Sequence, residues 1–105
     1  MFTEYNIKLS IEAERDLQNV IIYIKNNLKD PISAERYAHL MKNEIESLKY
    51  NPKRYAIIDN KKIEDLQVRK LIIKNYIAFY RVNEEKKLVN IERILYGASN
   101  WMSKL

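Results

Sequence analysis

The chain has 105 residues, which is room for one domain with one core, and we take residues 1–105 as a single domain. It contains no cysteine, one histidine and one glycine, which excludes disulfides, thiolate metal sites, cysteine nucleophiles and glycine-rich phosphate loops, so neither a metal nor a cofactor is expected. Nineteen basic residues against fourteen acidic residues give a net charge of +5, which favours an acidic partner or a polyanion.

The N-terminal sequence MFTEYNIK lacks the basic start and the apolar run of a secretion signal. No stretch of the chain approaches the roughly 18 apolar residues that a membrane span requires. The lack of cysteine suits a reducing compartment. We therefore expect a cytoplasmic protein with no membrane partner.

The first half of the sequence predicts one strand and two helices. Residues 3–9 alternate between apolar and polar side chains, as a half-buried strand does. Ser10 is a suitable N-cap for a helix whose apolar residues recur at helical spacing over 13–28. The Asp-Pro pair at 30–31 begins a second helix, which extends to about Lys49.

The second half predicts a loop followed by three strands. Residues 50–66 hold a proline, a basic pair and a polar tract, which predicts an exposed loop. Residues 67–73, 76–82 and 88–96 are rich in β-branched and aromatic side chains, and the connections between them are short enough for hairpins. We therefore predict an α+β fold with the order β-α-α-β-β-β, in which a helical hairpin packs on one face of an antiparallel four-stranded sheet.

The residue types that remain for chemistry are cations and aromatic rings. His39 is expected to be a partly exposed helix residue, and the serines have no recognisable base beside them. These cations and rings could bind RNA, or they could form an ordinary surface. Arg69 and Arg93 share their strand faces with apolar residues, which predicts partial burial of each against a carboxylate. The full set is Lys53, Arg54, Tyr55, Arg69, Lys70, Lys74, Tyr76, Tyr80, Arg81, Arg93 and Tyr96.

Several motifs in chain order resemble the RelE/ParE family of toxins. The resemblance covers nearly the whole chain and is strongest in its second half. It implies a growth-arresting toxin that a cognate antitoxin holds inactive in a hetero-oligomer. The motifs are Tyr5 to Ser10, Ala13, Asp16-Leu17, Tyr23-Ile24, Asn51-Pro52-Lys53-Arg54, Val68 to Val82, and Ile91 to Gly97.

The family has two activities on one fold, and the fold alone does not choose between them. Some members cleave messenger RNA on the ribosome without a metal, and others, the ParE group, block DNA gyrase. For the nuclease, the resemblance points to Arg69, Arg93 and Tyr96 as catalytic residues. For target contact, it points to Lys53, Arg54, Lys74 and Trp101. A third alternative is an inactive member that only binds a partner.

Two departures from the nuclease members favour the gyrase-inhibiting branch slightly. Ile77 stands where many of them carry an arginine, and Ala98-Ser99-Asn100 replace basic residues that often follow the glycine. Loss of a cation aimed at a developing oxyanion typically costs a hundredfold or more in rate. In a ParE-like protein the tail from Gly97 to Leu105, with Trp101 and Met102 exposed, is a candidate contact surface; the alternative is a tail that packs on the sheet.

Overall fold

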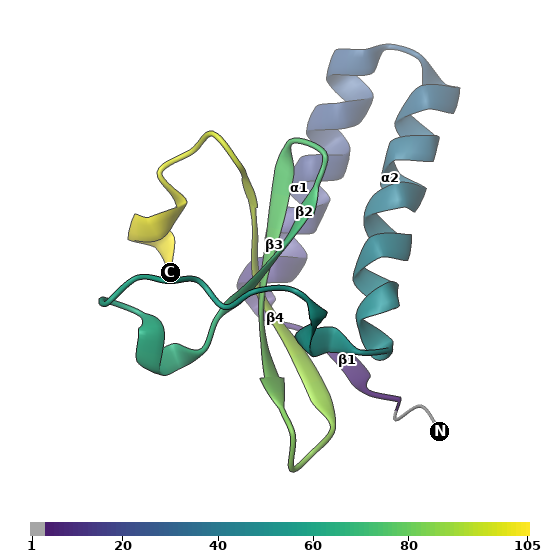
Figure 1. The fold of residues 1–105 in the computed structure, drawn as a ribbon. Helices are drawn as coiled ribbons and strands as arrows, with labels where there is room; N and C mark the ends of the chain where they lie inside the picture. Colours follow the sequence, from purple (N-terminus) through teal and green to yellow (C-terminus); the bar gives the residue numbers. More distant parts are fainter. Residues whose placement is uncertain (1–3) are drawn as a thin grey trace.

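The computed structural model describes residues 4–105 and contains two helices beside a four-stranded sheet (Figure 1). The predicted first strand includes Thr3, which lies outside the described residues. The strands and helices follow the predicted order. Their bounds are β1 Asn6–Leu9, α1 Ile11–Leu28, α2 Pro31–Glu46, β2 Arg69–Ile73, β3 Tyr76–Asn83 and β4 Leu88–Tyr96.

Both helices begin at the predicted caps. The Ser10 hydroxyl accepts a hydrogen bond from the Ala13 amide at 2.9 Å, and the Asp30 carboxylate accepts one from the Ile32 amide at 3.1 Å. Each cap therefore satisfies a backbone N–H that has no partner within the helix. Lys29 ends α1 with a left-handed backbone, φ 56°, so the chain reverses at once into α2.

The sheet has the order β1-β4-β3-β2 and is mixed. The last three strands form the predicted antiparallel meander. The prediction of a wholly antiparallel sheet was wrong, because β1 pairs with β4 in parallel. Hairpin connections force neighbouring strands to run antiparallel, but β1 leads into a helix, so its direction is set by the sheet edge that it joins.

Apolar clusters cover both faces of the sheet. The larger one lies between the sheet and the helices and includes Met41, Leu71, Tyr80 and Ile91. On the opposite face, the loop before β2 and the C-terminal segment cross the sheet (Figure 1). The predicted loop over 50–66 is therefore only partly exposed, since Ile58 and Ile63 are buried in this second cluster.

Short 3-10 turns complete the chain: Ser47–Lys49, Pro52–Arg54, Glu64–Leu66 and Trp101–Lys104. The first two turn the chain back from α2 toward the sheet. Within residues 4–105, no helix is both long enough and apolar enough to cross a membrane.

Candidate functional site

Arg93 lies on β4 beside the start of α1 and pairs with Asp16. Its Nε and Nη2 donate to the two carboxylate oxygens at 2.7 and 3.0 Å, and the Ile94 amide donates to the same carboxylate at 3.0 Å. The hydrogen bonds that Arg93 donates to the Asp16 carboxylate raise the pKa of Arg93. The predicted partial burial of Arg93 against a carboxylate is confirmed, with exposed side-chain fractions of 25% and 12% for the pair.

Arg69 begins β2 and binds the backbone of the preceding loop. Its Nη1 donates to the carbonyl oxygens of Lys53 at 3.0 Å and Tyr55 at 2.6 Å. The predicted carboxylate partner was wrong, because the loop turns its carbonyl groups toward this guanidinium. The neighbouring Tyr80 hydroxyl donates to the Pro52 carbonyl, and burial raises the pKa of Tyr80 to about 12. The hydrogen bonds of Arg69 and Tyr80 hold the loop before β2 against the sheet.

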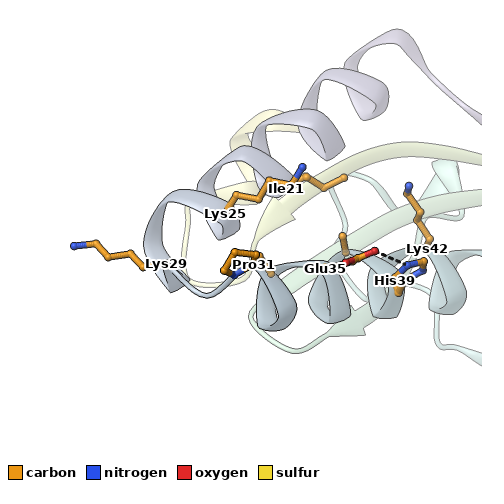
Figure 2. A pocket seen from close by; sticks show the side chains of 9 residues that line it. Ile21, Lys25, Lys29, Pro31, Glu35, His39 and Lys42 are labelled. Atoms are coloured by element: carbon orange, nitrogen blue, oxygen red, sulfur yellow. Dashed lines mark ion pairs between the residues drawn. The ribbon is translucent and has the colours of Figure 1, made fainter.

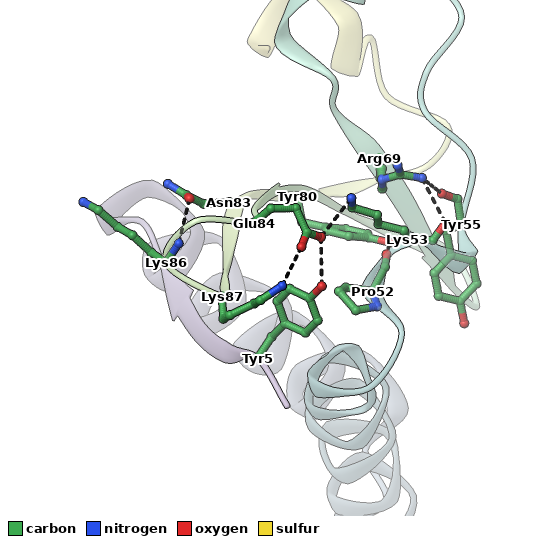
Figure 3. A network of polar contacts seen from close by, with 10 residues as sticks. All are labelled: Tyr5, Pro52, Lys53, Tyr55, Arg69, Tyr80, Asn83, Glu84, Lys86 and Lys87. Atoms are coloured by element: carbon green, nitrogen blue, oxygen red, sulfur yellow. Dashed lines mark hydrogen bonds and ion pairs between the residues drawn. The ribbon is translucent and has the colours of Figure 1, made fainter. Parts of the chain in front are cut away.

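Lys53 belongs to a charged network around Glu84 in the β3–β4 turn (Figure 3). The ammonium groups of Lys53 and Lys87 each lie 2.8 Å from a Glu84 carboxylate oxygen, and the Tyr5 hydroxyl donates to that carboxylate at 2.8 Å. Hydrogen bonds from Lys53, then Lys87 and Tyr5, lower the pKa of Glu84 to about 2. The network joins the loop, the turn and the segment before β1.

Arg54 closes the end of α2. Its guanidinium donates to the carbonyl of the C-cap residue Ser47 at 3.3 Å and to the Ser47 hydroxyl at 2.8 Å. It also donates to the Tyr50 carbonyl at 2.6 Å and lies 4.8 Å from the centre of the Tyr55 ring. Carbonyl groups at a helix end lack partners within the helix, and a cation there also opposes the negative end of the helix dipole. Arg54 therefore has a structural role in addition to any contact with a target.

Tyr96 and Lys74 lie at the opposite end of the sheet from Arg69. Arg69 pairs with Tyr80 and Tyr96 pairs with Tyr76, so these positions are four residues apart along β3, about 13 Å. The Tyr96 ring packs edge-on against Tyr76 at 5.7 Å. The structure therefore does not bring Arg69 and Tyr96 together, and Arg93 is turned away toward α1.

Tyr37 of α2 and Tyr23 of α1 lie near this end of the sheet, and no local pattern in the sequence indicated either position. Tyr37 of α2 packs edge-on against Tyr76 at 6.3 Å, and the Lys74 ammonium lies 5.3 Å from the centre of the Tyr37 ring. Burial, and then the proximity of Tyr37, Tyr23 and Tyr96, raise the pKa of Tyr76. The Tyr37 hydroxyl is buried and has no hydrogen-bond partner among the described residues.

Trp101 packs on the sheet and is only partly exposed. Its ring centre lies 5.0 Å from that of Phe79, and Met102 and Leu105 join the same cluster. The expectation of an exposed Trp101 and Met102 was wrong, and the alternative of a tail that packs on the sheet is confirmed. The Lys70 ammonium lies 5.7 Å from the centre of the Trp101 ring.

Comparison with known proteins identifies the family of this chain. The family model described as ParE toxin of the type II toxin–antitoxin system, parDE, matches residues 7–101. The chain belongs to the ParE toxin family. None of the curated proteins compared with the chain matches it.

Solved structures of toxin–antitoxin systems share the fold of this ParE-family chain. It is similar to a chain of the chromosomal ParDE system of P. aeruginosa, with a TM-score of 0.70 and 19% identity over 90% of this chain and 97% of that one. A chain of the RelBE2 toxin–antitoxin complex from Mycobacterium tuberculosis has a TM-score of 0.63 and 19% identity, and the match covers 92% of this chain and 95% of that one. A chain of the archaeal RelE–RelB complex from Pyrococcus horikoshii has a TM-score of 0.55 and 17% identity, and the match covers 90% of this chain and 97% of that one.

Outside the sheet, the toxin carries a groove between its two helices on the side away from the strands (Figure 2). Its volume is about 560 Å³, Ala34 and Ala38 line it, and Lys25, Lys29 and Lys42 border it. His39 at its edge is exposed, as predicted, and lies 3.8 Å from Glu35. Among residues 4–105, no group of three or more His, Cys, Asp or Glu side chains could hold a metal ion.

Proposed function

We propose that this ParE-family toxin arrests growth by binding and inhibiting DNA gyrase, and that a cognate antitoxin neutralises it. The observation that carries this proposal is the cluster of apolar side chains that covers the sheet face opposite the helices. Ile77 is 7% exposed and packs in one cluster with Phe79, Leu95 and Trp101. Where nuclease relatives often carry an arginine, this chain therefore has a buried apolar side chain.

The contacts of the candidate catalytic residues also favour a binding toxin. Metal-independent RNA cleavage needs cations and a base that converge on one phosphate. Arg93 is paired with Asp16, and Arg69 donates to two carbonyl groups. Tyr96 lies about 13 Å along the sheet from the level of Arg69. A cleaving toxin would have to rearrange these contacts, whereas an inhibitor that acts by binding would not.

Charge supports an antitoxin partner. The net charge of +5 and the groove between α1 and α2, which is lined by three lysines and by the single carboxylate of Glu35, suit an acidic segment with small or apolar residues on one side. The structures with the same fold come from toxin–antitoxin systems. In the proposed complex, toxin and antitoxin form a hetero-oligomer, and the antitoxin prevents contact with the target.

A supercoiling reaction with purified gyrase and no ribosomes tests the proposed activity. The toxin is expected to block supercoiling or to trap cleaved DNA, and the same toxin premixed with its antitoxin is expected to have no effect. Mapping of messages from induced cells supplies the second measurement. Normal supercoiling at saturating toxin, together with new message ends, would reject gyrase in favour of RNA cleavage by Arg69, Arg93 and Tyr96.

The same culture also tests the inactive alternative. A toxin that leaves growth, plasmid topology and messages unchanged, but still binds the antitoxin, would be an inactive member. Lys53, Arg54, Lys74 and Trp101 remain the proposed target contacts from the family resemblance. Of the three cations among these, Lys74 has the fewest competing contacts. Its ammonium group lies over the Tyr37 ring but forms no ion pair among the described residues, whereas Lys53 is paired with Glu84 and Arg54 donates to the turn after α2.

A further inference from the structure

Exposed apolar side chains gather where the β2–β3 turn meets the far end of α1. The side chains of Tyr23, Ile72 and Tyr96 are 59%, 62% and 50% exposed, and Leu28 is 45% exposed. The Tyr96 ring packs edge-on against the buried ring of Tyr76, and Tyr23 is near enough to contribute to the raised pKa of Tyr76. Ile72 alternates with the buried Leu71 and Ile73, so it lies on the sheet face away from the helices, and Lys74 at the turn connects it to the helix side. Large exposed rings and aliphatic groups are typical of protein interfaces.

Two hollows flank the β2–β3 turn, and Lys74 at its tip lines both. One has a volume of about 480 Å³ and lies between the turn and the helices, where Leu28, Arg36 and Tyr37 line it. The other has a volume of about 230 Å³, and Ile72 and Tyr96 line it. Neither hollow has an aspartate or glutamate in its lining.

The cations of this surface are available to a partner. Neither Arg36 nor Lys74 forms an ion pair among residues 4–105, in contrast to Lys53, Lys87 and Arg93. Unpaired cations beside apolar side chains, with no carboxylate between them, complement a partner that carries carboxylates beside an apolar side chain.

A protein fits this surface better than a nucleic acid. The exposed rings of Tyr23 and Tyr96 can contact either a base or an apolar side chain, so the number of cations decides between the two partners. Two cations are few for a phosphate backbone, which proteins commonly hold with several. Tyrosine and arginine are in turn the side chains enriched at the centres of protein interfaces.

We infer that the toxin contacts its protein target through this tyrosine surface, made of Tyr23, Leu28, Arg36, Ile72, Lys74 and Tyr96, and that the target presents carboxylates beside an apolar side chain. The inference rests on the proposed function, because an inhibitor that acts by binding needs such a contact. Of the target contacts proposed from the family resemblance, it places Lys74 at the centre and leaves Lys53, Arg54 and Trp101 outside.

Substitutions on the tyrosine surface test the inference, with growth arrest and antitoxin affinity measured on the full-length chain. Lys74→Glu reverses a charge in one turn, and Lys86→Glu makes the same change in the exposed β3–β4 turn at the other end of the sheet (Figure 1). Tyr23→Ser removes an exposed ring, and Tyr50→Ser removes a ring of similar exposure elsewhere. Thermal melts and soluble amounts confirm that all four variants fold.

We expect Lys74→Glu and Tyr23→Ser each to raise the toxin level needed for growth arrest about tenfold or more, while antitoxin affinity stays within about threefold of the native value. The two controls should arrest growth like the native toxin. Native-like arrest by Lys74→Glu and Tyr23→Ser would overturn the inference. So would a parallel loss of antitoxin affinity, since the surface would then belong to the antitoxin.

The supercoiling reaction on the native toxin separates this inference from the proposed function. Native toxin could leave gyrase active and messages intact while the two variants lose growth arrest and keep their antitoxin affinity. That result would reject gyrase as the target, and the inference would hold with another protein as the target. If native toxin cleaves messages, the inference fails together with the binding function.

Discussion

Asp16 and Arg93, 77 positions apart in the chain, form an ion pair at the part of the β4 edge that β1 does not cover. β1 pairs with β4 only as far as Ile91, so the strand beyond that point has no strand neighbour on this side. The Asp16 carboxylate accepts the Ile94 amide and both donors of the Arg93 guanidinium there. One helical residue thus takes the place of a strand and fixes α1 to the sheet.

Replacement of Asp16 should therefore destabilise the whole fold. Asp16→Ala leaves the Ile94 amide and the partly buried Arg93 guanidinium without their acceptor, and we expect a loss of about 2 kcal/mol in the free energy of unfolding. Urea denaturation followed by circular dichroism measures it. Gln18→Ala, at an exposed position of the same helix, should change stability little, and equal stabilities for the two variants would contradict the account.

The Glu84 network should give the toxin an acid-sensitive component of stability. Contacts with Lys53, Lys87 and Tyr5 lower the pKa of Glu84 from its ordinary 4.5 to about 2 in the folded chain. A group with a lowered folded pKa stabilises the fold above its unfolded pKa, and this contribution disappears as pH falls from about 4.5 through about 2. Glu84→Gln lacks the titrating group, so its stability should fall less steeply in that window.

Denaturation midpoints of the native chain and Glu84→Gln, measured from pH 7 to pH 2, give the difference that isolates this group. The variant should be the less stable protein at pH 7, and the two should converge at low pH. Glu85→Gln, beside it in the same turn but without an ion pair among the described residues, is the matched control. Parallel curves for the native chain and Glu84→Gln would show that the network contributes no pH dependence.

Local patterns in the sequence predicted most of the fold. Ser10, Asp30 and Pro31 predicted both helix starts. The content of β-branched and aromatic residues predicted the bounds of the three C-terminal strands to within two residues. The parallel pairing of β1 was missed because no local pattern records the direction of a strand that is not part of a hairpin. The burial of Ile58 and Ile63 was missed because their polar neighbours indicated an exposed loop.

The candidate site was less predictable because its contacts join distant segments. The apolar neighbours of Arg93 indicated a buried carboxylate partner, but nothing local identified Asp16. The same signal failed for Arg69, whose partners are backbone carbonyl groups of a loop without a periodic pattern. Tyr23 and Tyr37 reach the end of the sheet only because the helical hairpin lies alongside β4 and β2.

The unpartnered hydroxyl of Tyr37 predicts a stabilising substitution. A buried hydroxyl without a hydrogen bond costs about 1–3 kcal/mol, whereas the ring itself packs against Tyr76 and Lys74. Tyr37→Phe keeps the ring and removes the hydroxyl, so the free energy of unfolding should rise by about 1 kcal/mol. Tyr80→Phe is the opposite control, because its hydroxyl donates to the Pro52 carbonyl and its removal should destabilise the chain.

Both tyrosine variants are compared with the native chain by urea denaturation. The two substitutions remove the same atom, so a difference in sign between them isolates the effect of a hydrogen-bond partner. A destabilised Tyr37→Phe would mean that the Tyr37 hydroxyl finds a partner in solution, such as bound water.

The packing of Trp101 on Phe79 predicts that the C-terminal segment stabilises the second face of the sheet. Trp101→Ala removes a half-buried ring, and we expect a loss of about 2 kcal/mol in the free energy of unfolding, less than full burial of a tryptophan would give. Trp101→Phe should retain most of that stability. Trp101 is the only tryptophan, so native fluorescence reports this contact directly, and an emission maximum already at the position of the unfolded chain would show that the tail does not pack on the sheet in solution.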